Sequence, residues 1–183
     1  MRENRTIPGD TQPAVDLQTV HADGTPIADL LHGMALRDIV THTDDRGSVF
    51  ELFDPRWGWH PEPLAFSYVF TILPGVTKGW GLHARHDDRY ALIQGAMELV
   101  CYDVREDSPT VGQVSKLVLS EHRRQLVNVP AGVWHADRNI GSSDVLVVNF
   151  PTTLYDHTAP DKVRLPLDTP EIPYSFETGR IGW

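Results

Sequence analysis

The fold is decided by Pro130-Ala131-Gly132-Val133-Trp134-His135-Ala136-Asp137-Arg138-Asn139, the most specific stretch of the sequence. Proline fixes one backbone angle and glycine adopts angles that are closed to other residues, so Pro130 and Gly132 predict a tight turn between two strands. Beyond this turn, we expect His135 to point into the mouth of a β-barrel, where a ligand or a metal ion binds.

Short runs rich in apolar, β-branched and aromatic residues lie on both sides of this stretch and predict β-strands. They cover residues 36–40, 48–53, 66–72, 89–94, 96–102, 114–119, 126–129 and 145–150. Glycine, proline and serine separate the runs, and no long amphipathic helix pattern interrupts them. The pattern predicts an all-β fold in which two sheets form a jelly-roll barrel.

The chain divides into three parts by composition. Residues 1–35 contain prolines and glycines without sustained periodicity and predict an N-terminal arm. Residues 36–158 hold the strand pattern and predict one domain, as a length of 183 residues favours. Residues 159–183 contain four prolines, so we expect an extended C-terminal strap over the barrel.

Composition excludes several classes of protein. With 40% hydrophobic and 22% charged residues, the chain resembles neither disordered nor fibrous proteins. The net charge of -9 argues against non-specific binding to nucleic acid or to an anionic membrane, so we expect neither as a partner. Cys101 is the single cysteine, and the sequence starts without an apolar leader. We therefore expect a cytoplasmic protein without disulfides.

Residues 130–139 resemble PxGxxHxxxN, the second motif of the cupin superfamily. The first cupin motif, HxH followed by Glu and Gly, is similar in part to Gly81-Leu82-His83, Asp88 and Gly95, with glycine in place of the first histidine. Trp80-Gly81-Leu82-His83 resembles the Arg-Gly-Leu-His signature of the dTDP-4-dehydrorhamnose 3,5-epimerase family. Members of this cupin branch act without a metal on nucleotide-linked 4-keto sugars.

Further segments resemble the same family in the same order. They are Asp45 to Glu51, Tyr102 to Gly112, Leu119 to Leu126 and Pro160 to Tyr174. The resemblance extends from about Leu36 to Phe176. It implies a cupin double-stranded β-helix, the jelly-roll barrel, and a homodimer. It also implies an isomerase, an epimerase of a nucleotide-linked 4-keto-6-deoxy sugar, in the biosynthesis of activated deoxysugars for polysaccharides or natural products.

The resemblance implies His83 as the general base that removes a proton next to the ketone. A neutral imidazole is well suited to this step near pH 7. Arg89 stands near the family's enolate-stabilising lysine and is the candidate replacement, with Lys78 as a second cation. Tyr155 matches a second tyrosine of the family and is the third candidate catalytic residue, near the site of reprotonation. Asn149 stands where the family has its proton-donating tyrosine.

Candidate substrate-binding residues follow from the same alignment of motifs. Arg46 matches an arginine that binds the nucleotide diphosphate, and a guanidinium suits paired phosphate oxygens. The other candidates are Glu51, Lys78, Trp80, His135 and Asn149. On a regular strand, Lys78 and His83 point to opposite faces unless a bulge intervenes.

The sequence leaves two alternatives open. The first is a metal-dependent cupin, an isomerase or dioxygenase, in which His83, Asp88 and His135 bind a divalent metal ion. The second is a non-catalytic cupin that binds a sugar nucleotide. The favoured interpretation needs no cofactor.

Overall fold

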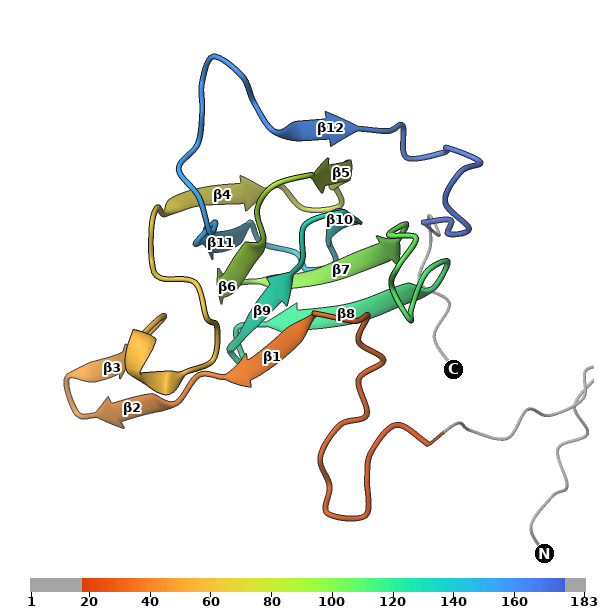
Figure 1. The fold of residues 1–183 in the computed structure, drawn as a ribbon. Coiled ribbons are helices and arrows are strands. Elements are labelled where there is room, and N and C mark those ends of the chain that lie inside the picture. The colour runs from red at the N-terminus through yellow and green to blue at the C-terminus, as the bar shows by residue number, and fades with distance from the viewer. Residues whose placement is uncertain (1–17, 177–183) are drawn as a thin grey trace, which may run out of the picture.

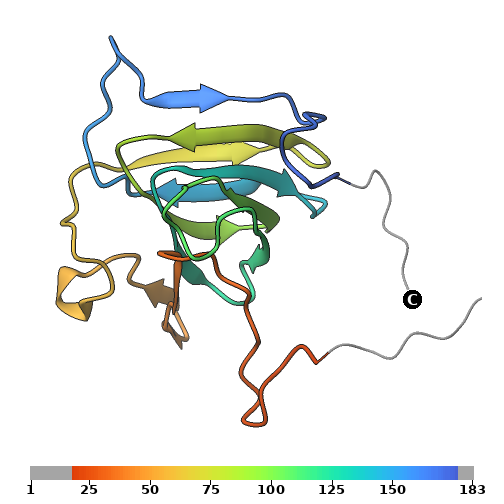
Figure 2. The ribbon, with the colours of Figure 1, turned by 45° about the vertical axis from the view of Figure 1, so that its right-hand side comes forward.

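The computed structural model describes residues 18–176 and shows two antiparallel five-stranded sheets packed face to face (Figures 1 and 2). This architecture confirms the predicted all-β jelly roll. The first and last residues of the chain, 1–17 and 177–183, lie outside the described part, as do the outer ends of the predicted arm and strap. Within residues 18–176, no helix has the length and apolar character needed to cross a membrane.

The strands follow the order of a jelly roll, in which neighbours in space are distant in sequence. The first sheet contains, in order, β1 (Ala35–Asp38), β9 (Gln125–Val129), β6 (Asp88–Gln94), β11 (Val145–Asn149) and β4 (Tyr68–Ile72). The second contains β12 (Lys162–Arg164), β5 (Thr77–His83), β10 (Val133–Asn139), β7 (Ala96–Asp103) and β8 (Val114–Ser120). A hairpin of β2 (Thr41–Asp44) and β3 (Gly47–Phe50) stands apart from both sheets, followed by a 3-10 turn, η1 (Pro55–Trp57) (Figure 1).

The main core lies between the two sheets and follows from strand periodicity. Alternate residues of β7, Met97, Leu99 and Cys101, are fully buried and meet Leu92 and Val127 of the first sheet. Burial of each large aliphatic side chain contributes about 1.5–3 kcal/mol. Cys101 is therefore a core residue, and burial raises the pKa of its thiol well above the usual value.

The predicted turn lies between β9 and β10 and fixes the end of β5. Gly132 has a φ of 78°, and a Cβ atom there would lie 2.9 Å from Cγ of Arg105. The backbone N–H of Gly132 donates a hydrogen bond of 2.7 Å to the carbonyl of His83. The turn motif thus holds His83 next to the strand that carries His135.

The C-terminal segment crosses the second sheet as an extended strap. Its strand β12 pairs with β5 at the edge of the sheet (Figure 2), and in this pairing Lys162 lies opposite His83. Further along, Ile172, Tyr174 and Phe176 pack around Trp80, which is 0% exposed. Trp80 therefore lies in a core beneath the strap and not in a ligand site, which differs from its predicted role in substrate binding.

Candidate active site

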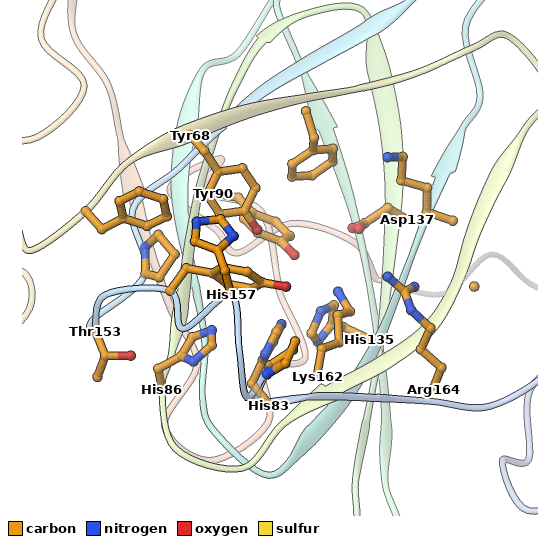
Figure 3. Close-up of a pocket in the computed structure, with 17 residues that line it drawn as sticks. Tyr68, His83, His86, Tyr90, His135, Asp137, Thr153, His157, Lys162 and Arg164 are labelled. Carbon is orange, nitrogen blue, oxygen red and sulfur yellow. The ribbon is translucent and has the colours of Figure 1, made fainter.

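A cavity of about 520 Å³ opens at one end of the barrel. It is lined by strands β4, β5, β6, β10 and β12 and by the loop after β11. Lys162 lies beside His83 and His135, and the phenols of Tyr68 and Tyr90 lie on another wall (Figure 3). The lining residues are Phe66, Tyr68, Phe70, Lys78, Gly79, His83, His86, Tyr90, His135, Asp137, Pro151, Thr153, Tyr155, His157, Pro160, Lys162 and Arg164.

A bulge in β5 directs two candidate residues into this cavity. His135 of β10 pairs with Gly81, whereas Asp137, two residues later, pairs with Lys78, three residues earlier. The extra residue in β5 shifts the alternation of its side chains. Both Lys78 and His83 consequently line the cavity, although a regular strand would separate them.

Asp88 is the central carboxylate of the site and is 1% exposed. It accepts hydrogen bonds from the Tyr90 hydroxyl at 3.1 Å and from Nδ2 of Asn149 at 2.7 Å. Its Oδ2 lies 3.4 Å from Nε2 of His83 and 3.5 Å from Nε2 of His135. Burial opposes ionisation, but the surrounding donors and histidines outweigh it and hold the pKa of Asp88 below its usual range. Asp88 is an anion at neutral pH.

His83 and His135 are neutral bases on either side of this anion. Burial lowers the pKa of His83 to about 4, although Asp88 opposes the shift. Burial, and next the positive charge of Lys162, lower the pKa of His135 to about 3. Among residues 18–176, neither ring nitrogen of His83 has a hydrogen-bond partner. His83 thus has a nitrogen free for a ligand, with a carboxylate placed to stabilise its protonated form.

His86 connects the barrel to the strap through two carboxylates. Its Nδ1 lies 3.0 Å from Asp161 and its Nε2 lies 3.7 Å from Asp88. Burial alone would lower the pKa of His86, but the hydrogen bonds and charges of the two carboxylates raise it. Asp161 also accepts backbone hydrogen bonds from Ala84 and Arg85, which anchors the strap beside the site.

The hydroxyl of Tyr68 lies beside Asn149, the position at which the resemblance implied a proton-donating tyrosine that this sequence lacks. Asn149 pairs with Tyr68 on the neighbouring strand β4 and donates a hydrogen bond of 2.9 Å to the Tyr68 hydroxyl. Burial, followed by the charge of Asp88, raises the pKa of Tyr68 to about 12, so this hydroxyl keeps its proton. Tyr155 lies at the outer rim, 43% exposed, with its ring against His157.

Asp137 lines the cavity two residues after His135, on the same face of β10. It is 5% exposed, and its Oδ1 has no hydrogen-bond partner among the described residues. Burial raises the pKa of Asp137 to about 7, and Lys162 opposes this shift. The motif contained the signal for Asp137, because alternate residues of a strand share one face.

Arg89 lies outside the cavity, which differs from its predicted role. It is 0% exposed, and its guanidinium donates hydrogen bonds to the carbonyls of Phe150, Glu62 and Pro63. Its neighbours in β6, Asp88 and Tyr90, occupy the site face, so alternation turns Arg89 to the opposite face. Arg89 holds a loop and does not reach a ligand in the cavity.

Two predicted substrate-binding residues, Arg46 for the diphosphate and Glu51, also lie away from this cavity. Arg46 stands at the tip of the β2–β3 hairpin, with its guanidinium bound to Asp44 and its side chain 84% exposed. Glu51 follows β3 and is exposed. Neither residue lines the cavity of its own chain.

Three potential metal ligands converge in the site. One donor atom each from His83, Asp88 and His135 lies within 4.8 Å of the others. A cupin metal site takes a further histidine from the position that is Gly81 here. The Lys162 side chain fills the space beside Gly81, and its charge lowers the pKa values of both histidines. Two histidines and one carboxylate are a known donor set for a divalent cation, and the positive charge of Lys162 in the same cavity opposes the binding of one.

Comparison with known proteins identifies a family and several relatives. The family described as polysaccharide biosynthesis C-terminal domain matches residues 42–163. A probable low-salt glycan biosynthesis epimerase, Agl13, of Haloferax volcanii is 35% identical over 139 residues, which span 75% of this chain and 89% of the relative. The spore coat polysaccharide biosynthesis protein SpsL of Bacillus subtilis is 30% identical over 151 residues, 81% of this chain and 98% of SpsL.

Among solved structures, a dTDP sugar isomerase from Desulfovibrio desulfuricans is similar, with a TM-score of 0.74 and 25% identity. The superposition covers 79% of this chain and 91% of the isomerase. The match covers most of both chains, so the similarity to this structure concerns the fold as a whole and not only short motifs.

Proposed function

Because this chain belongs to the polysaccharide biosynthesis C-terminal domain family, we propose that it is an epimerase of a nucleotide-linked 4-keto-6-deoxy sugar that serves glycan or polysaccharide biosynthesis. The names of the Haloferax and Desulfovibrio relatives support an epimerase and a sugar-nucleotide substrate. The proposal rests on the position of His83 between the cavity and the ionised Asp88. His83 is neutral, and its ring nitrogens have no hydrogen-bond partner among the described residues.

The proposed reaction begins at the carbon next to the ketone. A nitrogen of His83 takes the proton, the C–H electron pair forms the C=C bond of an enolate, and the negative charge moves to the ketone oxygen. The imidazolium that forms is stabilised by Asp88, 3.4 Å away. A tautomer with its proton on Nε2, toward Asp88, leaves the Nδ1 lone pair for this step.

Reprotonation from the opposite face completes the inversion. Tyr68 carries a protonated hydroxyl, and Asn149 donates a hydrogen bond to its oxygen, which stabilises a transient phenolate. The phenolate recovers a proton from water and His83 returns its proton to solvent, so the reaction is an isomerisation without net change in composition. Tyr155, at the rim, contacts the outer part of the substrate in this proposal.

The proposed chemistry uses no metal or other cofactor, because an enolate forms by proton transfer alone. Treatment with EDTA followed by gel filtration is expected to leave the rate unchanged. A rate that disappears with the metal and returns with a stoichiometric divalent cation would favour the metal-dependent alternative that uses His83, Asp88 and His135.

The deciding experiment measures deuterium uptake from heavy water into dTDP- and UDP-linked 4-keto-6-deoxyglucose, with mass spectrometry and NMR to locate the label. We expect label at C3, at C5 or at both, and its loss in His83→Gln. If the folded protein binds dTDP but exchanges no deuterium with either compound, the result would contradict the epimerase proposal and favour a non-catalytic protein that binds a sugar nucleotide.

We also propose that the protein is a cytoplasmic homodimer. The β2–β3 hairpin projects from the sandwich with Val49 65% exposed, and Val40 before it is 67% exposed (Figure 1). Apolar side chains on a projecting hairpin favour contact with a second subunit. Light scattering after gel filtration measures the mass, and a monomer at micromolar concentration would contradict the proposal.

A further inference from the structure

The Lys162 side chain occupies a space that exists because residue 81 is glycine. A Cβ atom built on Gly81 would lie 2.2 Å from Cε of Lys162 and 2.8 Å from its Nζ. Distances this short do not occur between a real Cβ and its neighbours, so any other residue at 81 displaces the lysine. The backbone of Gly81 has a negative φ, which means that space and not conformational freedom requires glycine here.

Lys162 enters the site from the strap. Strand β12 pairs with β5 in the register Lys162 opposite His83 and Arg164 opposite Gly81, and the lysine side chain reaches back over Gly81. It lies beside His83 and His135 in the cavity (Figure 3). The backbone of Lys162 is fixed by the three residue pairs between β12 and β5. The preceding residue, Asp161, is fixed by the hydrogen bond that it accepts from the backbone N–H of Arg85.

The ammonium group is charged and unengaged. Among residues 18–176 it donates no hydrogen bond and has no carboxylate within ion-pair distance, although the fields of Asp88 and Asp137 reach it. Burial lowers the pKa of Lys162, and these two acids oppose the shift. A half-buried ammonium with unused donors is available to an oxygen of a ligand in the cavity.

Other cations near the cavity are less suitable. Arg89 uses its guanidinium on three carbonyl groups of a loop. Lys78 lies at the exposed rim with its ammonium 5.4 Å from the centre of the Phe70 ring. Arg164 is also exposed.

We propose that Lys162 is a catalytic residue that donates a hydrogen bond to the ketone oxygen and stabilises the enolate, and that Gly81 provides the space for it. This inference rests on the proposed epimerase function. His83 removes the proton from carbon, the electron pair shifts to the oxygen, and the oxygen receives its stabilising charge from Lys162. Preorganised positive charge at a developing oxyanion contributes about 10²–10³-fold in rate.

The test compares Lys162→Met, which keeps an unbranched side chain, with Lys116→Met, a matched change on the exposed side of β8. We expect Lys162→Met to lower the initial rate of deuterium exchange at saturating substrate at least about 100-fold. The melting temperature and the calorimetric affinity for dTDP are expected to stay close to those of the unmodified protein. Lys116→Met should retain full exchange.

Gly81→Ala tests the space directly, alone and in combination with Lys162→Ala. In the unmodified background, we expect Gly81→Ala to lower the exchange rate and to leave the melting temperature nearly unchanged, because the new methyl group displaces only the end of the flexible Lys162 side chain. In the Lys162→Ala background, the same change should cost little further in either measurement. Equal losses of exchange rate in both backgrounds would overturn the link between Gly81 and Lys162.

The outcomes separate the two proposals. Exchange by the unmodified protein that persists within about threefold in Lys162→Met would overturn the role of Lys162 and leave the epimerase function standing. Absence of exchange in the unmodified protein, with both sugar nucleotides, would overturn both proposals. A loss of exchange in Lys162→Met with dTDP affinity intact supports both.

Discussion

Replacement of Asp88 by asparagine removes the anion behind His83 and keeps the shape of the side chain. At the 3.4 Å between His83 Nε2 and Asp88 Oδ2, two unit charges attract by about 5 kcal/mol at an effective dielectric constant of about 20. With about half of the proton transferred in the transition state, the variant loses about 2.5 kcal/mol of stabilisation. This loss predicts a decrease of about 70-fold in the rate of proton abstraction.

The assay is the initial rate of deuterium incorporation at saturating substrate, followed by mass spectrometry. Asp144→Asn, a change at an exposed position, is the matched control and should retain the full rate. Calorimetric titration with dTDP establishes that the Asp88→Asn protein still binds nucleotide. A rate within about threefold of the unmodified protein, with binding intact, would refute the assignment of Asp88 as the group that supports His83.

Three further predictions follow from the site and the motif turn. Tyr68→Phe should retain deuterium exchange by His83 but lose inversion, measured by NMR of the product; inversion at the full rate would exclude Tyr68 as the donor. Because the folded-state pKa of Asp137 is about 7 against an ordinary 3.8, its protonated form stabilises the fold below pH 3.8, and this contribution is lost as the pH rises through 7. Denaturant titrations should therefore show a smaller loss of stability between pH 4 and 7 in Asp137→Asn, and identical pH profiles would contradict the burial effect. Gly132→Ala, at a φ of 78° and 2.9 Å from Cγ of Arg105, should lower the free energy of unfolding by at least about 1 kcal/mol in the same titrations; an unchanged midpoint would show that the turn tolerates a side chain.

Local patterns in the sequence are sufficient for the fold class, although β5 and β10 are not among the predicted apolar runs. The apolar run in residues 96–102 and the Pro130–Gly132 turn each depend on neighbours in the chain, and the structure has a strand and a turn at these places. The predicted roles of Trp80 and Arg89 differ from the structure because their contacts come from residues distant in sequence. The strap covers Trp80, and the carbonyl groups of a loop accept hydrogen bonds from Arg89.

The site was predictable in part for the same reason. His83 and His135 belong to motifs, and both line the cavity. Lys162 and Tyr68 left no local signal, because their approach depends on the pairing of β12 with β5 and of β4 with β11. The bulge in β5, which brings Lys78 to the cavity, depends on a mismatch in register between two strands.

The strap also gives the molecule an order of assembly. Apart from β12, all strands of the two sheets that enclose the main core precede Pro151 in the chain, and Lys162, which adds positive charge to the cavity, comes later. The same segment covers Trp80 and places Lys162 beside Gly81. A polypeptide emerging from the ribosome can therefore contain His83 and Tyr68 before Lys162 is synthesised, and a change in the fluorescence of Trp80 would report the packing of the strap.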